Sequence, residues 1–141
     1  MKRLSTLLSF SLLIFVALTL VSCDPAVRIA KKLEGNWDVT SYTEDGVEFM
    51  TVDINTFKIE FEEYADDEGD FSWTLIDTGG ASIILDGTYE MKKDGDEMDI
   101  TFKSGALNGT SSTLDVDLNE DELGLSGNIN GFLIKIEADR D

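Results

Sequence analysis

Apolar side chains alternate with polar ones in short segments from Trp37 onward, and this period of two constrains the fold most. Phe57, Ile59 and Phe61, for example, alternate with charged or polar neighbours. The same alternation recurs over residues 71–75, 85–91, 98–102, 114–118 and 132–136. Successive side chains of a β-strand point to opposite faces, so each segment is predicted to be a strand with one buried face.

Turn residues separate these segments. The separators are Asp45-Gly46, Glu68-Gly69, Asp94-Gly95, residues 119–121 and Asn130-Gly131. Residues 37–42, 47–52 and 123–126 supply further short strands, and residues 105–112 are predicted to form a loop. Such connections are too short for parallel crossovers. Because a closed barrel leaves no open edges, we predict an antiparallel up-and-down β-barrel of about eight strands.

A short helix is predicted before the first strand, over residues 24–35. Asp24 can cap it, Pro25 suits its first position, and Gly35 can end it. The alternative is a flexible tether.

The first 23 residues have the order of a secretory leader. Lys2 and Arg3 precede an apolar run from Leu7 to Val21, which is followed by Ser22 and the chain's single cysteine, Cys23. Leu20-Val21-Ser22-Cys23 resembles the lipobox of bacterial lipoproteins. This resemblance implies cleavage before Cys23, acylation of that cysteine by diacylglyceryl and palmitate-type chains, and a membrane anchor. A plain secretory leader with an incidental cysteine is the alternative.

Gly35-Asn36-Trp37 follows the predicted helix and opens the first strand. This G-x-W signature resembles the lipocalin and fatty-acid-binding superfamily, and in particular the lipocalin-like lipoproteins of Gram-negative bacteria. The resemblance implies that the helix closes one end of the barrel, that Trp37 packs over that end, and that a late arginine, here Arg140, stacks on it. The expected organisation is a signal peptide (1–22), a lipidated cysteine with a short helix (23–35), and a lipocalin-like barrel (36–141).

The composition argues against an enzyme. The chain has no histidine and no cysteine besides Cys23, so Ser-His-Asp and Cys-His mechanisms are excluded. The acidic run from Glu62 to Asp70 lacks the ligand rhythm of a calcium loop and is interpreted as a solvated turn. We therefore expect no catalytic residues, no metal site and no cofactor.

The mature chain is strongly acidic. Removal of Lys2 and Arg3 with the leader leaves nine basic residues against 29 acidic ones, a formal charge of −20. Such a surface repels nucleic acid and anionic head groups, whereas it attracts cationic proteins.

Large apolar residues dominate the positions predicted to face inward. The candidate ligand-lining residues are Phe57, Phe61, Phe71, Trp73, Tyr89, Met91, Met98, Phe102 and Phe132. An eight-stranded barrel is just wide enough to be filled by side chains or to hold one small ligand. The list suits a packed core and an adaptable apolar pocket alike, and Gly87 and Ser41 are the small inward residues that could leave space.

Two functions remain open from the sequence. The first is a membrane-anchored, lipocalin-like binding lipoprotein of the bacterial envelope that holds a small hydrophobic ligand. The second is a filled barrel whose acidic face binds a cationic protein partner. The expected location is the cell envelope, anchored by Cys23 to the inner or outer membrane and facing the periplasm; in enterobacteria, Asp24 after the cysteine favours the inner membrane.

Overall fold

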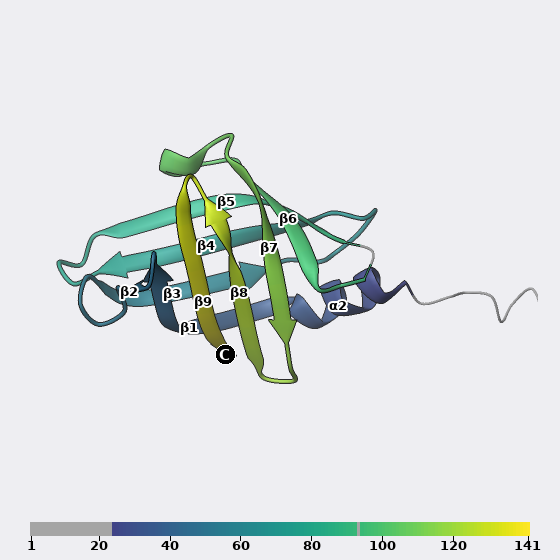
Figure 1. Ribbon diagram of the computed structural model, residues 1–141, viewed down its shortest axis with the longest axis horizontal. Helices are drawn as coiled ribbons and strands as arrows, with labels where there is room; N and C mark the ends of the chain where they lie inside the picture. Colours follow the sequence, from purple (N-terminus) through teal and green to yellow (C-terminus); the bar gives the residue numbers. More distant parts are fainter. Residues whose placement is uncertain (1–23, 93) are drawn as a thin grey trace, which may run out of the picture.

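The computed structural model describes residues 24–92 and 94–141, which form a closed antiparallel barrel with one short helix (Figure 1). The leader, Cys23 and the acylation predicted there lie outside the described residues. The helix is α2 (Pro25–Leu33), a 3₁₀ turn is η1 (Gly105–Leu107), and the strands are β1 (Gly35–Glu44), β2 (Val47–Glu48), β3 (Ile54–Phe61), β4 (Gly69–Asp77), β5 (Ser82–Met91), β6 (Glu97–Phe102), β7 (Ser111–Leu118), β8 (Glu122–Ile129) and β9 (Phe132–Arg140).

Neighbouring strands pair in chain order from β3 to β9, and β1 closes the barrel by pairing with both β3 and β9. Eight strands form the wall, while β2 is a two-residue addition to the end of β1. The predicted up-and-down barrel is therefore confirmed. The strand predicted over 47–52 is shorter, because the amides of Asp53 and Ile54 both donate to the carbonyl of Phe49 and turn the chain there.

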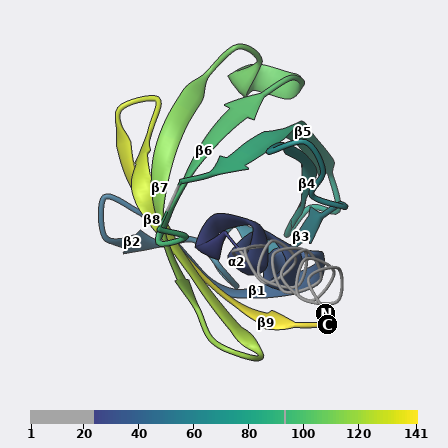
Figure 2. The same ribbon diagram turned by 90° about the vertical axis from the view of Figure 1, so that its right-hand side faces the viewer.

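The helix α2 lies across one end of the barrel, as the end view in Figure 2 shows. The side chain of Asp24 accepts a hydrogen bond from the amide of Ala26 at 3.0 Å and caps the helix. Ala26, Ala30 and Leu33 form its buried face. Gly35 then starts β1 with a φ of +118°, a backbone conformation that residues with a Cβ rarely adopt.

Trp37 packs over this closed end and is fully buried. Its indole N–H donates to the carbonyl of Leu33 at 2.8 Å, which joins the strand to the helix. The guanidinium of Arg140 stacks on the indole, 4.3 Å from the ring centroid. The stacking that the family resemblance implied for Arg140 is therefore present.

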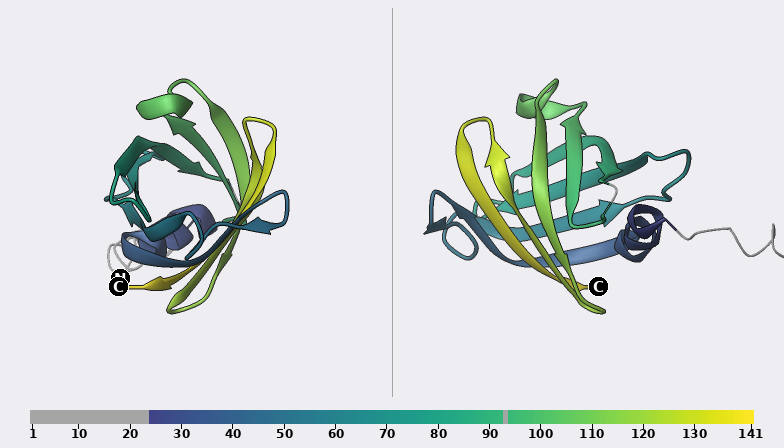
Figure 3. Two further views of the ribbon diagram at one scale, coloured as in Figure 1. Left: turned by 90° about the vertical axis from the view of Figure 1, so that its left-hand side faces the viewer. Right: turned by 45° about the vertical axis from the view of Figure 1, so that its right-hand side comes forward.

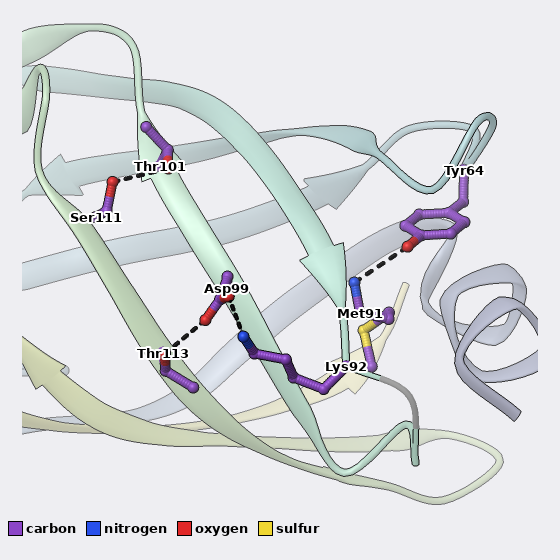
Figure 4. Close-up of polar contacts among 7 residues, drawn as sticks. All are labelled: Tyr64, Met91, Lys92, Asp99, Thr101, Ser111 and Thr113. Carbon is purple, nitrogen blue, oxygen red and sulfur yellow. Dashed lines mark hydrogen bonds and ion pairs between the residues drawn. The ribbon is translucent and has the colours of Figure 1, made fainter.

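Tyr64 joins two further segments at the closed end. Its hydroxyl accepts a hydrogen bond from the amide of Met91 at 3.1 Å, drawn in Figure 4, and donates to the carbonyl of Asp67. Burial raises the pKa of the Tyr64 phenol, so the hydroxyl keeps its proton at neutral pH.

The opposite end of the barrel is not covered by the helix, and several turns surround it. Figure 3 shows η1 and the β8–β9 turn lying away from α2. The antiparallel order brings the β1–β2, β4–β5 and β8–β9 turns to this open end.

Candidate binding site at the open end of the barrel

A pocket of about 190 Å³ lies at the open end, and we call it the mouth pocket. Its lining residues come from β1, β3, β4, β5, β8, β9, the β8–β9 turn and η1, and they are Tyr42, Glu44, Phe57, Trp73, Leu75, Leu85, Leu107, Ile129, Asn130, Phe132 and Ile134. Drug-sized ligands occupy pockets of about 300–1,000 Å³. An apolar cavity of about 150 Å³ accommodates benzene, so the mouth pocket suits a ligand built around a single ring.

Aromatic rings form the inner wall of the mouth pocket. Tyr42 meets Phe57 edge-on, with ring centroids 5.5 Å apart, and Phe57 meets Trp73 at 5.6 Å. Trp73 in turn contacts Phe102 at 5.3 Å in an edge-to-face arrangement. Such contacts restrict ring motion, so the wall is largely formed before a ligand arrives.

A β-bulge in β1 turns Tyr42 and Glu44 into the barrel. The register with β9 shifts between Val39 and Ser41, where Thr40 is the extra residue. Before the bulge, Trp37 and Val39 face inward; after it, Tyr42 lies opposite Ile136 and Glu44 opposite Ile134.

The expectation that Ser41 is a small inward residue is therefore wrong. Its hydroxyl instead donates to the exposed Glu48 at 2.6 Å. Reasoning from the sequence also missed Tyr42 and Glu44 as pocket residues. The sequence carried one hint, because the apolar positions of this segment change from odd numbers (Trp37, Val39) to an even one (Tyr42), but a single position does not establish a bulge.

Glu44 supplies the carboxylate of the mouth pocket. The Tyr42 hydroxyl donates a hydrogen bond to this carboxylate. Burial raises the pKa of Tyr42 well above its ordinary value, and the bond to Glu44 raises it further, so the phenol stays protonated and remains a donor. The bond holds one oxygen of Glu44 in place on the pocket wall.

The turn that follows Glu44 is tied to the start of β9. The amide of Asp45 donates to the carbonyl of Leu133 at 2.8 Å, and the amide of Leu133 donates to the Asp45 carboxylate at 2.9 Å. This pair of bonds holds Glu44 and Phe132, the neighbours of Asp45 and Leu133, on adjacent strands at the rim.

The predicted ligand-lining residues fall into three groups according to their position relative to the mouth pocket. Phe57, Trp73 and Phe132 line the mouth pocket, and Phe132 is 48% exposed at its rim. Phe71 and Phe102 lie against Trp73 and are buried. The remaining members are buried outside the pocket lining: Phe61, Tyr89, Met91 and Met98. Gly35 and Trp37 lie at the closed end, away from the pocket.

The interior is closely packed around Gly87, beyond the mouth pocket. A Cβ added to Gly87 would lie 2.6 Å from Cζ of Phe71 and 2.3 Å from the carbonyl oxygen of Thr101. The ring of Phe71 therefore occupies the space that the absent side chain leaves. Phe61 and Tyr89 meet edge-on at 5.0 Å.

Exposed apolar side chains surround the open end. Val47, Val52, Ile83, Ile84, Phe132 and Leu133 are each between 48% and 64% exposed. All of them lie on strand ends or turns at this end of the barrel. An apolar rim of this kind is typical of a binding surface.

A second concavity, of about 580 Å³, lies on the outer face of β7, β8 and β9. It is larger than the mouth pocket, but exposed charged side chains line much of it. Lys135 is paired there with Glu137 at 2.7 Å. We call it the outer groove.

The part of the chain that the structure describes holds no group of three or more side chains placed to bind a metal ion. Over the same residues, no helix has the length and apolar character needed to cross a membrane.

The geometry of the barrel is similar to that of several solved structures. A redesigned β-barrel matches with a TM-score of 0.62 at 21% identity, covering 81% of this chain and 96% of its own. A lipocalin-like protein from Bacteroides uniformis matches with a TM-score of 0.52 at 20% identity, covering 78% of this chain and 99% of its own. The fold is lipocalin-like.

A redesigned β-barrel bound to DFHBI matches with a TM-score of 0.58 at 18% identity, covering 80% of this chain and 99% of its own. No protein-family model matches the sequence, and no curated protein matches it closely enough to indicate a relative.

Proposed function

We propose that this protein is a membrane-anchored binding lipoprotein of the bacterial envelope that holds a small hydrophobic molecule in the mouth pocket. The observation that carries the proposal is the apolar, aromatic-lined pocket of about 190 Å³ at the open end of the barrel. Burying the apolar surface of a ligand there supplies about 25 cal/mol for each Å² removed from water. The DFHBI-bound barrel supports the idea that a barrel of this geometry can hold a small molecule.

The role we propose is binding without catalysis. The candidate pocket presents one carboxylate, one phenol and one amide among apolar side chains. Its carboxylate, Glu44, and its phenol, Tyr42, are hydrogen-bonded to each other, and none of the described lining residues is a serine, threonine, cysteine or lysine that could serve as a nucleophile.

The anchor we propose would leave the mouth pocket accessible. Cys23 immediately precedes Asp24, which caps α2 at the closed end. Acyl chains on Cys23 would insert in the bilayer and tether that end, while the rim with Ile83 and Phe132 would face away from the membrane. Two or more chains give stable anchoring, whereas one chain gives only reversible binding.

A titration of 2-phenylethanol, a neutral single-ring probe, tests the binding function. In the wild type, probe in the pocket should change the fluorescence of Trp73, whereas Trp37 lies at the closed end; variants that add a tryptophan are compared with the wild type by calorimetry. Leu107→Trp should fill the pocket and weaken binding by about tenfold or more, since the added indole replaces the ligand. Leu133→Trp is the matched control, because Leu133 is 59% exposed and lies outside the pocket lining.

Equal binding by the wild type and Leu107→Trp, or no saturable binding at all, would rule out the mouth pocket as the ligand site. Native mass spectrometry of the gently purified protein complements this test, because a bound molecule that is lost on denaturation would reveal the natural ligand's mass.

The alternative function, recruitment of a cationic protein partner, has one observation in its favour. The outer groove carries five carboxylates against one lysine, namely Asp115, Asp117, Glu122, Glu137 and Asp139 with Lys135. Opposite charge accelerates association and makes it sensitive to salt. Capture of a basic envelope protein that is lost in Asp117→Asn/Asp139→Asn, or at high salt, would support this alternative; capture that ignores both changes would count against it.

A further inference from the structure

We propose that the mouth pocket selects small organic cations, that is, a single aromatic or branched apolar body carrying a protonated amine. The inference rests on the proposed binding function and adds the chemical class of the ligand. Three independent features of the pocket support it.

The first feature is the carboxylate at the pocket wall. Glu44 is half-buried, and the bulge at Thr40 turns it inward, although a charged residue is costly at such a position. The Tyr42 hydroxyl occupies one of its oxygens. A carboxylate can accept about four hydrogen bonds, so accepting sites remain for a ligand.

The second feature is the absence of a cationic side chain from the described lining of the pocket. Among the lining residues that the structure describes, none is lysine or arginine. The ion pairs found within residues 24–92 and 94–141 involve Lys58, Lys92 and Lys135, and none of them includes Glu44. A ligand ammonium would supply the missing positive charge.

The third feature is the aromatic wall beside Glu44. The faces of Tyr, Trp and Phe rings attract cations, most strongly where water is excluded. Tyr42, Phe57, Trp73 and Phe132 all line the pocket. Aromatic faces together with a carboxylate favour an organic ammonium over a neutral molecule of equal shape, and they disfavour an anion.

Size limits the class further. At about 190 Å³, the pocket suits one ring with a short side chain rather than a long acyl chain or a fused-ring system. The formal charge of −18 of the whole chain would raise the local concentration of such cations. Attraction of cations by the overall charge does not depend on Glu44, whereas selection in the pocket does. This difference makes the inference testable.

The experiment compares three probes that share a benzyl group and differ in their polar group: 2-phenylethylammonium, 2-phenylethanol and phenylacetate. Each is titrated calorimetrically into the purified full-length chain at neutral pH and moderate salt. We expect the ammonium to bind about tenfold more tightly than the alcohol, and phenylacetate to bind more weakly than both. Equal affinity for the ammonium and the alcohol in the wild type would overturn the inference without any variant.

Glu44→Gln keeps the shape of the side chain and removes its charge. It should abolish the preference for the ammonium while leaving the affinity for the alcohol within about twofold. Glu60→Gln removes the same charge from the exposed outer face of β3 and should leave the preference intact. A preference that survives Glu44→Gln, or that Glu60→Gln reduces equally, would overturn the assignment to Glu44.

The two proposals fail in different ways. Saturable binding of 2-phenylethanol without preference for the ammonium leaves the binding function standing and removes only the charge selectivity. Failure of all three probes to bind removes the binding function and, with it, this inference.

Discussion

The guanidinium of Arg140, near the end of the chain, covers the indole of Trp37, near the start of the barrel, at 4.3 Å from the ring centroid. The same guanidinium donates to the carbonyls of Lys32 at 2.5 Å and Glu34 at 3.2 Å. One side chain thus joins the last strand, the first strand and the end of α2. The closed end of the barrel depends on this contact between residues more than 100 positions apart.

Arg140→Lys should therefore destabilise the fold although it conserves the charge. A lysine has no planar fork, so it cannot stack on Trp37 and reach both carbonyls at once. The expected loss is about 1–3 kcal/mol in the free energy of unfolding, measured by urea denaturation. Lys135→Arg, on the exposed outer face of β9, should change stability by less than about 0.5 kcal/mol. Equal stability of Arg140→Lys and the wild type would contradict the proposed role of the stack.

Gly87→Ala should destabilise the barrel wall. Its new methyl group would lie 2.3 Å from the carbonyl oxygen of Thr101 and against the ring of Phe71. Because Thr101 belongs to a strand paired on both sides, its backbone cannot move away freely. We expect a loss of about 1–3 kcal/mol by thermal or denaturant unfolding.

Gly124→Ala is the matched control for Gly87→Ala. The Cβ at position 124 would meet Cβ of Asp117 at 3.4 Å, an ordinary contact. This variant should be neutral or slightly stabilising, because glycine weakens strands. Similar losses at the two positions would show that strand glycines matter for a reason other than the packing of Phe71.

Asp99 should contribute a small stability that depends on pH. Hydrogen bonds from Lys92, chiefly, and from Thr113 at 2.5 Å lower the pKa of its carboxyl (Figure 4). A lowered folded pKa stabilises the fold above the unfolded value of about 3.9, and the contribution disappears as the pH falls through the folded pKa.

Asp99→Asn measures this contribution. The side chains of Lys92 and Asp99 are 43% and 41% exposed, so solvent screening limits the loss at neutral pH to below about 1 kcal/mol. The unfolding free energies of the variant and the wild type should converge as the pH is lowered from about 5 to about 2. A difference that grows over this interval would mean that the ionised carboxylate does not stabilise the barrel.

Cys23→Ser tests the membrane anchor. If Cys23 carries the acyl chains, the variant should lose incorporation of labelled palmitate, and its N-terminal peptide should lose the mass of the lipid. Wild-type protein whose N-terminal peptide begins elsewhere, or carries an unmodified Cys23, would contradict the predicted lipoprotein.

The alternation of apolar and polar residues was enough to predict most of the strands and, apart from β1 after Thr40, their inward faces. Phe57, Ile59 and Phe61 are all buried, as are Met98, Ile100 and Phe102. This succeeded because strand periodicity is a local property, and one wet face leaves a clear pattern. The capped helix before Gly35 was predictable for the same reason, since Asp24, Pro25 and Gly35 act on the residues next to them.

Whether side chains fill the barrel or leave a pocket could not be predicted from the sequence. The same list of large residues suited a filled core and a pocket, and only the tertiary structure places Phe71 over Gly87 and leaves space beside Phe57 and Trp73. Packing depends on the distances between side chains on different strands, which no local pattern encodes.

The sequence by itself determined an antiparallel barrel and a short capped helix, and it predicts a leader over residues 1–22 followed by Cys23 in a lipobox-like sequence. Only the tertiary structure decided which face of β1 points inward after Thr40, and so placed Tyr42 and Glu44 in the mouth pocket. The physical reason is that one extra residue in a strand moves every following side chain to the other face. Whether β1 bulges at Thr40 depends on its pairing with β9, almost 100 residues later in the chain.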